Sequence, residues 1–169
     1  MRVLFIAFAL ALPAAPASAV DAGALWDSLR QGGRVALIRH AEAPGGAGDP
    51  AGFRLDDCAT QRNLSERGRR AAAELGARIR TQRVPVARVL TSQWCRCRET
   101  ARLMDLGEPV EAPTFNNAFA QRTPREDLER GARDLIAGWR GPGTLIVVTH
   151  GANILELTAI HPAQAAIVV

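Results

Sequence analysis

Three short apolar runs in the sequence are typical of buried strands. They cover residues 34–38, 86–91 and 144–149, and each is bounded by Gly, Pro or a polar stretch. The last run, Thr-Leu-Ile-Val-Val-Thr, gives the strongest strand signal in the chain. Residues 165–169 are also apolar and are a candidate for a closing strand.

Helical patterns alternate with these runs. The sequence predicts helices over residues 66–80, 94–106, 125–139 and 153–160. In the first of them, Ser65 is the expected N-cap, and Ala72, Leu75 and Ile79 are expected to lie on one face. Residues 43–52 and 112–123 have no clear period and are predicted to be loops.

This order of elements predicts an α/β fold. Strands that alternate with helices form βα units, which pair into a mostly parallel central sheet covered by helices on both faces. We therefore expect a three-layer sandwich. No internal repeat and no interdomain linker interrupts the pattern.

The first nineteen residues have the features of a secretory signal. A basic Arg2 precedes the apolar run 3–12, and Ala17-Ser18-Ala19 is a small-x-small cleavage pattern. The alternative, a membrane anchor, needs roughly 20 apolar residues, about twice this run. The sequence predicts a signal peptide over 1–19, one domain over 20–169, and a periplasmic or secreted protein.

The composition changes the list of possible partners. The 169 residues are 47% hydrophobic and 22% charged, which is typical of a globular protein and excludes a collagen, a disordered tail or a polytopic membrane protein. All 21 basic residues are Arg, but 17 acidic residues leave a net charge of only +4. Because the arginines are spread among acids, we expect no nucleic-acid partner. Once the signal is removed, we expect no membrane insertion.

Three cysteines allow two interpretations. Cys95-Arg96-Cys97 is too tight for the usual zinc spacing. In an oxidising compartment Cys58 can pair with Cys95 or with Cys97 and leave one thiol. The alternative is three reduced, partly buried thiols. A cysteine nucleophile is disfavoured because no base lies near it in the sequence.

The ends of the three predicted strands carry residues that suit an anion. Arg39 and His40 end the first, Arg96 lies just beyond the second, and His150 ends the third. In open parallel sheets ligands bind outside the carboxyl ends of the strands. Arg supplies fork-shaped donors to phosphate oxygens, so the sequence predicts a pocket for a dianionic phosphate.

Four motifs occur in a fixed order between residues 34 and 151. They are an Arg-His-Ala-Glu segment at 39–42, Asn-Leu-Ser-Glu-Arg-Gly at 63–68, a Ser-x-x-x-Arg-x-x-x-Thr-Ala box at 92–101, and Val-Thr-His-Gly at 148–151. Together they resemble the histidine phosphatase superfamily, which has the phosphoglycerate-mutase-like fold.

The resemblance implies a two-step mechanism. His40 would attack phosphorus to form a phosphohistidine, which water then hydrolyses. Arg39, Arg96 and His150 would bind the equatorial oxygens. No metal ion or cofactor is implied. His40 has to be neutral, so its other ring nitrogen is expected to donate to a backbone carbonyl.

The chain departs from the family in two respects that bear on catalysis. Ala41 replaces the usual Gly after His40, and the loop 113–122 lacks the acid that commonly protonates the leaving group. Glu42, Asp56 and Glu111 are the candidates for that role. A phosphoramidate, or another good leaving group, would need such an acid less.

The leading hypothesis is an exported phosphatase that acts on a small phosphorylated substrate, a phosphomonoester or a phosphoramidate. One alternative is an anion-binding module with weak or no turnover. The other is a metallohydrolase built on His40, His150 and Glu42, which the fixed charges of nearby arginines disfavour. His161 is expected to be a structural or surface residue. The sequence leaves the physiological substrate and the oligomeric state open.

Overall fold

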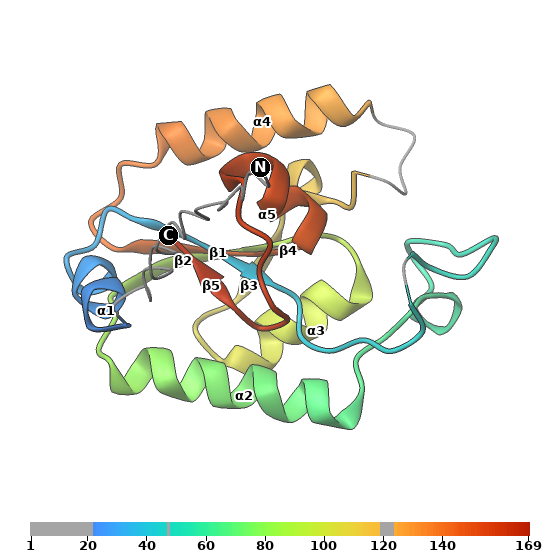
Figure 1. The fold of residues 1–169 in the computed structure, drawn as a ribbon, viewed down its shortest axis with the longest axis horizontal. Coiled ribbons are helices and arrows are strands. Elements are labelled where there is room, and N and C mark those ends of the chain that lie inside the picture. The colour runs from blue at the N-terminus through green and yellow to red at the C-terminus, as the bar shows by residue number, and fades with distance from the viewer. Residues whose placement is uncertain (1–21, 47, 119–123) are drawn as a thin grey trace, which may run out of the picture.

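One five-stranded sheet forms the centre of the molecule (Figure 1). The computed structural model describes residues 22–46, 48–118 and 124–169. The strand order is β3-β2-β4-β1-β5, and only β5 is antiparallel to its neighbour. The strands are β1 (Val35–Arg39), β2 (Val86–Thr91), β3 (Pro109–Glu111), β4 (Thr144–Thr149) and β5 (Ile167–Val168).

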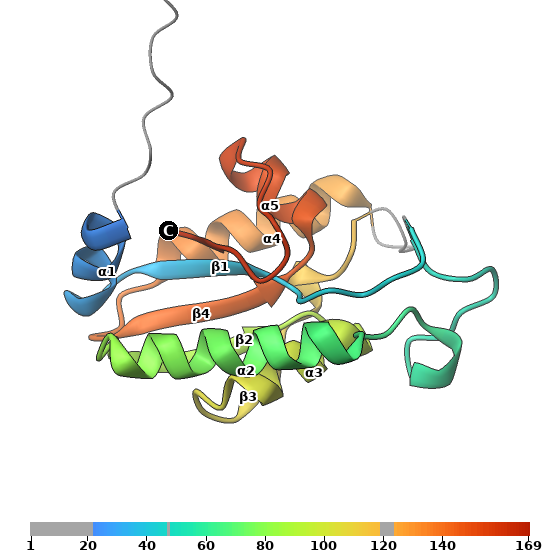
Figure 2. The same ribbon diagram turned by 60° about the horizontal axis from the view of Figure 1, so that its bottom comes forward.

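Helices cover both faces of this sheet, as Figures 1 and 2 show, so the expected three-layer α/β architecture is confirmed. α2 and α3 pack on one face, and α4 and α5 on the other; α1 lies at one end. The helices are α1 (Ala22–Arg30), α2 (Glu66–Thr81), α3 (Cys95–Met104), α4 (Arg125–Gly138) and α5 (Gly151–Thr158). Two short 3₁₀ helices cover Cys58–Thr60 and Pro113–Phe115.

The burial of the central strand β4 on both faces explains the apolar run in its sequence. All six of its residues are buried. Ile146 and Val148 pack with the α2 and α3 side, whereas Leu145 and Val147 pack with the α4 and α5 side. Side chains alternate between the faces of a strand, so a strand covered on both faces has buried side chains at every position, and the four central ones in β4 are apolar.

The predicted elements are largely confirmed, with differences at their ends. α3 ends at Met104, two residues before the prediction, because Asp105 caps it in the left-handed conformation with φ 52°. α5 begins at Gly151, two residues early. The closing strand is only two residues long. The sequence analysis did not anticipate α1 or the three-residue β3.

α2 and α3 approach each other closely at a glycine. A Cβ on Gly76 would lie 1.9 Å from the Met104 carbonyl oxygen, so no side chain fits there. At the other end of α2, Ser65 accepts a hydrogen bond from Gly68 N at 2.9 Å. A Cβ on Gly68 would lie 2.3 Å from the Glu42 carbonyl oxygen. These contacts fix α2 against α3 and against the segment that follows β1.

None of the helices in the described ranges is long and apolar enough to cross a membrane. The predicted signal peptide lies outside the described residues, so its boundary at residues 19 and 20 stays a prediction.

Candidate active site

The carboxyl ends of β1, β2 and β4 open onto a cavity of about 340 Å³. The four residues singled out from the sequence, Arg39, His40, Arg96 and His150, all line it. Its remaining lining residues are Gly48, Arg62, Asn117, Gly151, Ala152, Leu155 and His161. The fold therefore brings the three strand ends together, as the topology predicts.

His40 follows β1 and is held in one tautomer. Its backbone N–H donates to the Thr149 carbonyl at 2.9 Å, and its Nδ1 lies 2.8 Å from the Ala41 carbonyl oxygen. A carbonyl oxygen only accepts, so Nδ1 carries the hydrogen and Nε2 keeps its lone pair. Burial is the main cause that lowers the pKa of His40 to about 3, and nearby Arg96 and Arg62 lower it further. His40 is neutral at physiological pH.

His150 follows β4, and the centre of its ring lies 5.5 Å from that of His40. Its Nε2 is 2.9 Å from Ser92 Oγ, which is also 3.2 Å from Asn116 Oδ1. Burial, followed by the charges of His40 and the arginines, holds the pKa of His150 well below its ordinary value. The two imidazoles are therefore neutral and close together at the base of the cavity.

Arg96 is fully buried on the first turn of α3 and pairs with a residue that the sequence analysis did not select. Its Nη1 lies 2.7 Å from Asp49 Oδ1, and its Nη2 lies 3.3 Å from Asp49 Oδ2. Asp49 also accepts from the Arg62 backbone N–H at 3.0 Å and from Trp94 Nε1 at 2.9 Å. Burial raises the pKa of Asp49, but these hydrogen bonds outweigh it and the net pKa is lowered. Asp49 is a carboxylate.

Two further arginines, Arg39 and Arg62, line the same cavity as Arg96. Arg39 Nη1 donates to the Pro162 carbonyl at 2.9 Å, and Arg62 Nη1 donates to the Ala43 carbonyl at 2.7 Å. Burial and the neighbouring Arg96 lower the pKa of Arg62. Within the described chain, the Nε atoms of Arg39, Arg62 and Arg96 are buried and have no hydrogen-bond partner.

These charges define what the cavity can bind. Three arginines line the cavity, one carboxylate, Asp49, pairs with Arg96, and both histidines are neutral. Buried donors without partners are costly unless a ligand accepts their hydrogen bonds. An excess of two positive charges together with fork-shaped donors matches a dianionic phosphate group.

Thr100 joins the segment after β1 to α3. Its Oγ1 accepts from the Ala41 backbone N–H at 3.1 Å and donates to the Arg96 carbonyl at 2.7 Å. The position of the nucleophile candidate, His40, is thereby tied to that of the arginine beside it. This contact gives a physical reason for a threonine four residues after Arg96.

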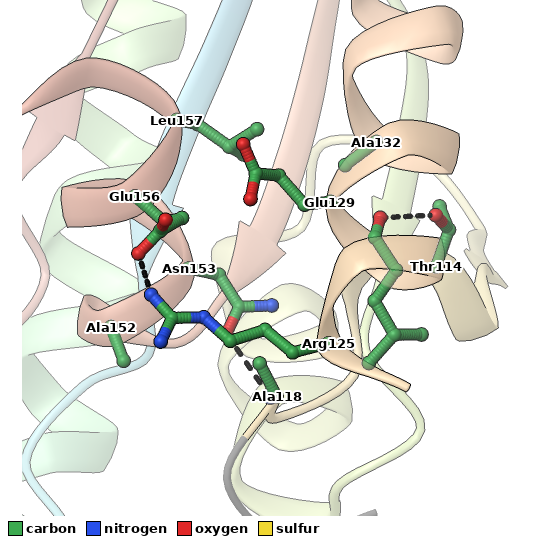
Figure 3. Close-up of a pocket in the computed structure, with 10 residues that line it drawn as sticks. Thr114, Ala118, Arg125, Glu129, Ala132, Ala152, Asn153, Glu156 and Leu157 are labelled. Carbon is green, nitrogen blue, oxygen red and sulfur yellow. Dashed lines mark hydrogen bonds and ion pairs between the residues drawn. The ribbon is translucent and has the colours of Figure 1, made fainter. Parts of the chain in front are cut away.

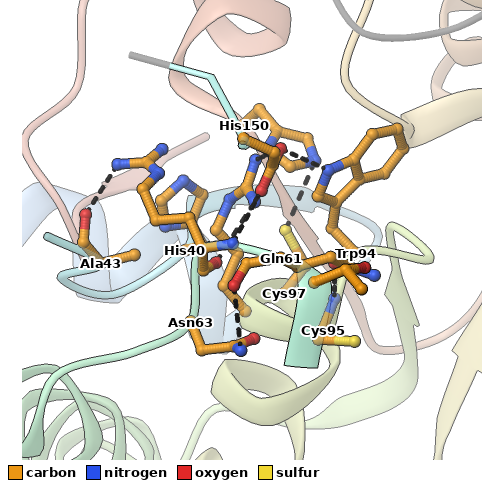
Figure 4. A network of polar contacts seen from close by, with 12 residues as sticks. His40, Ala43, Gln61, Asn63, Trp94, Cys95, Cys97 and His150 are labelled. Carbon is orange, nitrogen blue, oxygen red and sulfur yellow. Dashed lines mark hydrogen bonds and ion pairs between the residues drawn. The ribbon is translucent and has the colours of Figure 1, made fainter. Parts of the chain in front are cut away.

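A disulfide joins the loop before α2 to the start of α3. Cys58 pairs with Cys95, which decides between the two pairings left open by the sequence, and Cys97 is free and buried. Gln61 strengthens the same junction, because its Oε1 accepts from the Cys95 backbone N–H at 3.0 Å (Figure 4). Burial raises the pKa of Cys97 to about 12, so it is a protonated thiol and not a nucleophile.

The three carboxylates considered as the general acid do not line the cavity. Glu42 binds Arg67 and Ser65, and these hydrogen bonds lower its pKa to about 2, so it is ionised and holds no proton to donate. Asp56 is exposed beside Arg54. Glu111 pairs with Arg98 at 3.0 Å.

Three residues that the sequence analysis missed or interpreted differently line the cavity or bind one of its arginines. His161, expected to be structural or on the surface, lines it. Arg62 directly precedes the 63–68 motif, and this proximity could have marked it as a candidate site residue. Asp49 lies in a Gly- and Pro-rich loop, where nothing local marks it.

A second pocket lies between α4 and α5 (Figure 3). It is lined by Leu128, Ala132 and Leu157, and an ion pair between Arg125 and Glu156 lies beside it. Its volume of about 20 Å³ holds roughly one water molecule. It is too small for a substrate.

The described residues do not provide the set of metal ligands that the metallohydrolase alternative requires. Its carboxylate, Glu42, is bound to Arg67 and Ser65. In the part of the chain that the structure describes, no group of three or more His, Cys, Asp or Glu side chains is placed to hold a metal ion.

Two strand-end histidines together with one buried and two half-buried arginines at one edge of a mostly parallel sheet are typical of a phosphoryl-transfer class of α/β protein. The model of the histidine phosphatase superfamily (branch 1) matches residues 35–118. The chain belongs to the histidine phosphatase superfamily, whose members are phosphatase- or mutase-type enzymes.

Solved structures share this fold. A SixA protein from Agrobacterium tumefaciens is 24% identical, with a TM-score of 0.55 and 73% of each chain covered. The protein histidine phosphatase SixA in complex with tungstate is 18% identical, with a TM-score of 0.55, and the match covers 79% of this chain and 84% of that one. Phosphoglycerate mutase from Thermus thermophilus is 16% identical, with a TM-score of 0.53 and coverage of 78% and 85%. No curated protein sequence matches the chain.

Proposed function

We propose that this protein is an exported phosphatase that hydrolyses a phosphomonoester or a phosphoramidate through a phosphohistidine at His40. The observation that carries the proposal is the set of three buried arginine Nε donors without partners, on residues that share a cavity with a neutral His40. The protein histidine phosphatase SixA, which shares this fold, is solved in complex with tungstate, an oxyanion, and this supports an anionic ligand.

In the first step, the Nε2 lone pair of His40 attacks phosphorus and forms a P–N bond. The bond from phosphorus to the leaving oxygen or nitrogen breaks, and its electron pair goes to the leaving atom. In the second step, water attacks phosphorus and forms a P–O bond, the water gives up a proton, and the P–N bond breaks, which returns the electron pair to His40. Arg39, Arg62 and Arg96 hold the three equatorial oxygens and stabilise their charge.

The Ser92 hydroxyl gives His150 freedom to donate to the phosphate. It can accept from His150 Nε2–H and donate to Asn116 Oδ1, or it can donate to His150 Nε2 itself. His150 can therefore carry a proton on Nδ1, in the neutral or the charged form, when a phosphate oxygen needs a donor. We assign His150 to the stabilisation of transition-state charge.

Export is supported by two independent features. The sequence begins with the pattern of a signal peptide over residues 1–19, and Cys58 and Cys95 form a disulfide. Disulfides persist in oxidising compartments such as the periplasm and the extracellular space. We propose one of these as the location.

The proposal is tested by trapping the covalent intermediate. The full chain, oxidised, is mixed with ³²P-labelled phosphoramidate and quenched within one turnover. We expect acid-labile, base-stable label on the wild-type protein and none on His40→Ala. His150→Ala should keep binding inorganic phosphate but turn over about 10²–10³-fold more slowly, as expected for loss of one transition-state donor.

Three results contradict the proposal. Label that persists in His40→Ala would place the nucleophile elsewhere. Activity that disappears with a chelator but survives His40→Ala would favour the metallohydrolase. Phosphate binding without turnover on phosphoramidate, aryl phosphate or alkyl phosphate would identify an anion-binding module.

A further inference from the structure

The cavity has an inner part and a rim. The side chains at its base are almost completely buried, with 3% exposure for His40 and His150 and 0% for Arg96. His161 lines the same cavity but is exposed to solvent. In phosphoryl transfer the attacking and leaving atoms lie roughly in line. A substrate attacked from the base by His40 therefore directs its leaving group towards the rim.

The rim residue is held in place by its neighbours in the chain. Pro162 is buried, and its carbonyl accepts from Arg39 Nη1 at 2.9 Å. Three residues further on, the Ala165 backbone N–H donates to the Arg39 carbonyl at 3.1 Å. On the other side, Thr158 Oγ1 accepts from the Ile160 backbone N–H at 3.2 Å. The backbone of His161 is fixed relative to Arg39, which binds the phosphate in the proposed function.

His161 is also chemically distinct among the lining residues. The described residues that line the cavity include no carboxylate. Arginine does not release its proton in proteins. His40 and His150 belong to the phosphate-binding base of the cavity. Imidazole is the group that enzymes use most often as a general acid.

We propose that His161 is the general acid and base of the reaction, a conclusion that rests on the proposed function. As the P–N bond to His40 forms and the bond to the leaving oxygen breaks, the imidazolium of His161 gives its proton to that oxygen and becomes neutral. In the second step the neutral imidazole takes a proton from the attacking water, the P–N bond breaks, and His161 is again protonated.

The test compares two substrates in the oxidised full chain. p-Nitrophenolate leaves without a proton, whereas the alkoxide of β-glycerophosphate needs one. Because His161 also acts in the second step, which both substrates share, the rate constant of the first step is measured by rapid quench. In His161→Gln we expect this rate constant to fall by about 10²–10⁴-fold for β-glycerophosphate, the usual effect of a general acid, and by less than about 5-fold for p-nitrophenyl phosphate. Gln164→Ala changes an exposed residue of the same segment and serves as the matched control.

Calorimetric binding of inorganic phosphate checks that His161→Gln keeps the base of the cavity intact. Equal losses on both substrates, or no loss on either, would overturn the assignment of His161 while leaving the phosphatase function in place. Wild-type turnover of the aryl phosphate alone would do the same. If the wild type hydrolyses phosphoramidate but neither ester, the assignment of His161 fails alone. If it hydrolyses none of the three substrates, the proposed function fails and the role of His161 fails with it.

Discussion

The Cys58–Cys95 disulfide ties the loop that precedes α2 to the first residue of α3, and the effect of its removal can be worked out from the structure. The bond joins residues with a sequence separation of 37. The loss of loop-closure entropy in the unfolded chain for a loop of this size is about 13 cal/mol/K, or about 4 kcal/mol at 25 °C. We expect the double variant Cys58→Ala/Cys95→Ala to lose about that much stability.

The assay is thermal unfolding followed by circular dichroism. For a domain of about 150 residues, 1 kcal/mol corresponds to about 2–4 °C, so the melting temperature should fall by about 8–16 °C. A reducing agent should lower the melting temperature of the wild type by a similar amount and leave the double variant unchanged. Cys97→Ala, which removes a buried thiol outside the disulfide, is the control and should still respond to reduction.

Catalysis should be less sensitive than stability to this change. The junction also has the hydrogen bond from the Cys95 backbone N–H to Gln61, whose own Nε2 donates to the carbonyls of Arg54 and Leu55 at 2.9 and 3.0 Å. We therefore expect the loop to keep its fold at 25 °C without the bond. A melting temperature within about 2 °C of the wild type in the double variant would refute the reasoning, because it would mean that the loop adds no constraint to the unfolded chain.

Two further predictions concern buried charge. Asp49→Ala leaves Arg96 without its carboxylate partner. The free energy of unfolding, measured with urea, should fall by about 3–5 kcal/mol. Inorganic phosphate should stabilise this variant more than it stabilises the wild type. An equal stabilisation of the two proteins would argue that the phosphate and the Asp49 carboxylate do not share the charge of Arg96. The lowered pKa of His40, about 3 against 6.5, means that below pH 6.5 the unfolded chain binds a proton that the folded chain does not. Stability should therefore fall by about 1.4 kcal/mol per pH unit for this group as the pH drops from 6.5 towards 3. The free energy of unfolding should fall less between pH 7 and pH 5 in His40→Gln than in the wild type.

The parts of the site that the sequence predicted depend on one topological rule. Arg39, His40 and His150 end parallel neighbouring strands, and Arg96 follows the next strand along the sheet. The carboxyl ends of parallel strands meet at one edge, so a correct strand assignment was sufficient to bring these side chains together.

The parts that the sequence did not predict depend on contacts between distant segments. Asp49 is positioned by Trp94 and Arg96, more than forty residues away in the chain. Arg62 is positioned by its hydrogen bond to the Ala43 carbonyl. Neither loop has a period, so no local pattern relates its residues to the sheet edge. The same holds for β3, whose three residues are too few to give an alternation signal.

The Asp49 carboxylate resolves a conflict in a cavity built for an anion. One buried and two half-buried guanidinium groups would repel one another in the free protein, and burying a charge without a partner is expensive. Asp49 binds the Nη1 and Nη2 atoms of Arg96 and leaves its Nε without a partner. The carboxylate thereby offsets part of the repulsion and fixes the plane of the guanidinium before a phosphate arrives. Because the donor is already oriented, little reorganisation accompanies charge development in the transition state, which is the condition for effective electrostatic stabilisation.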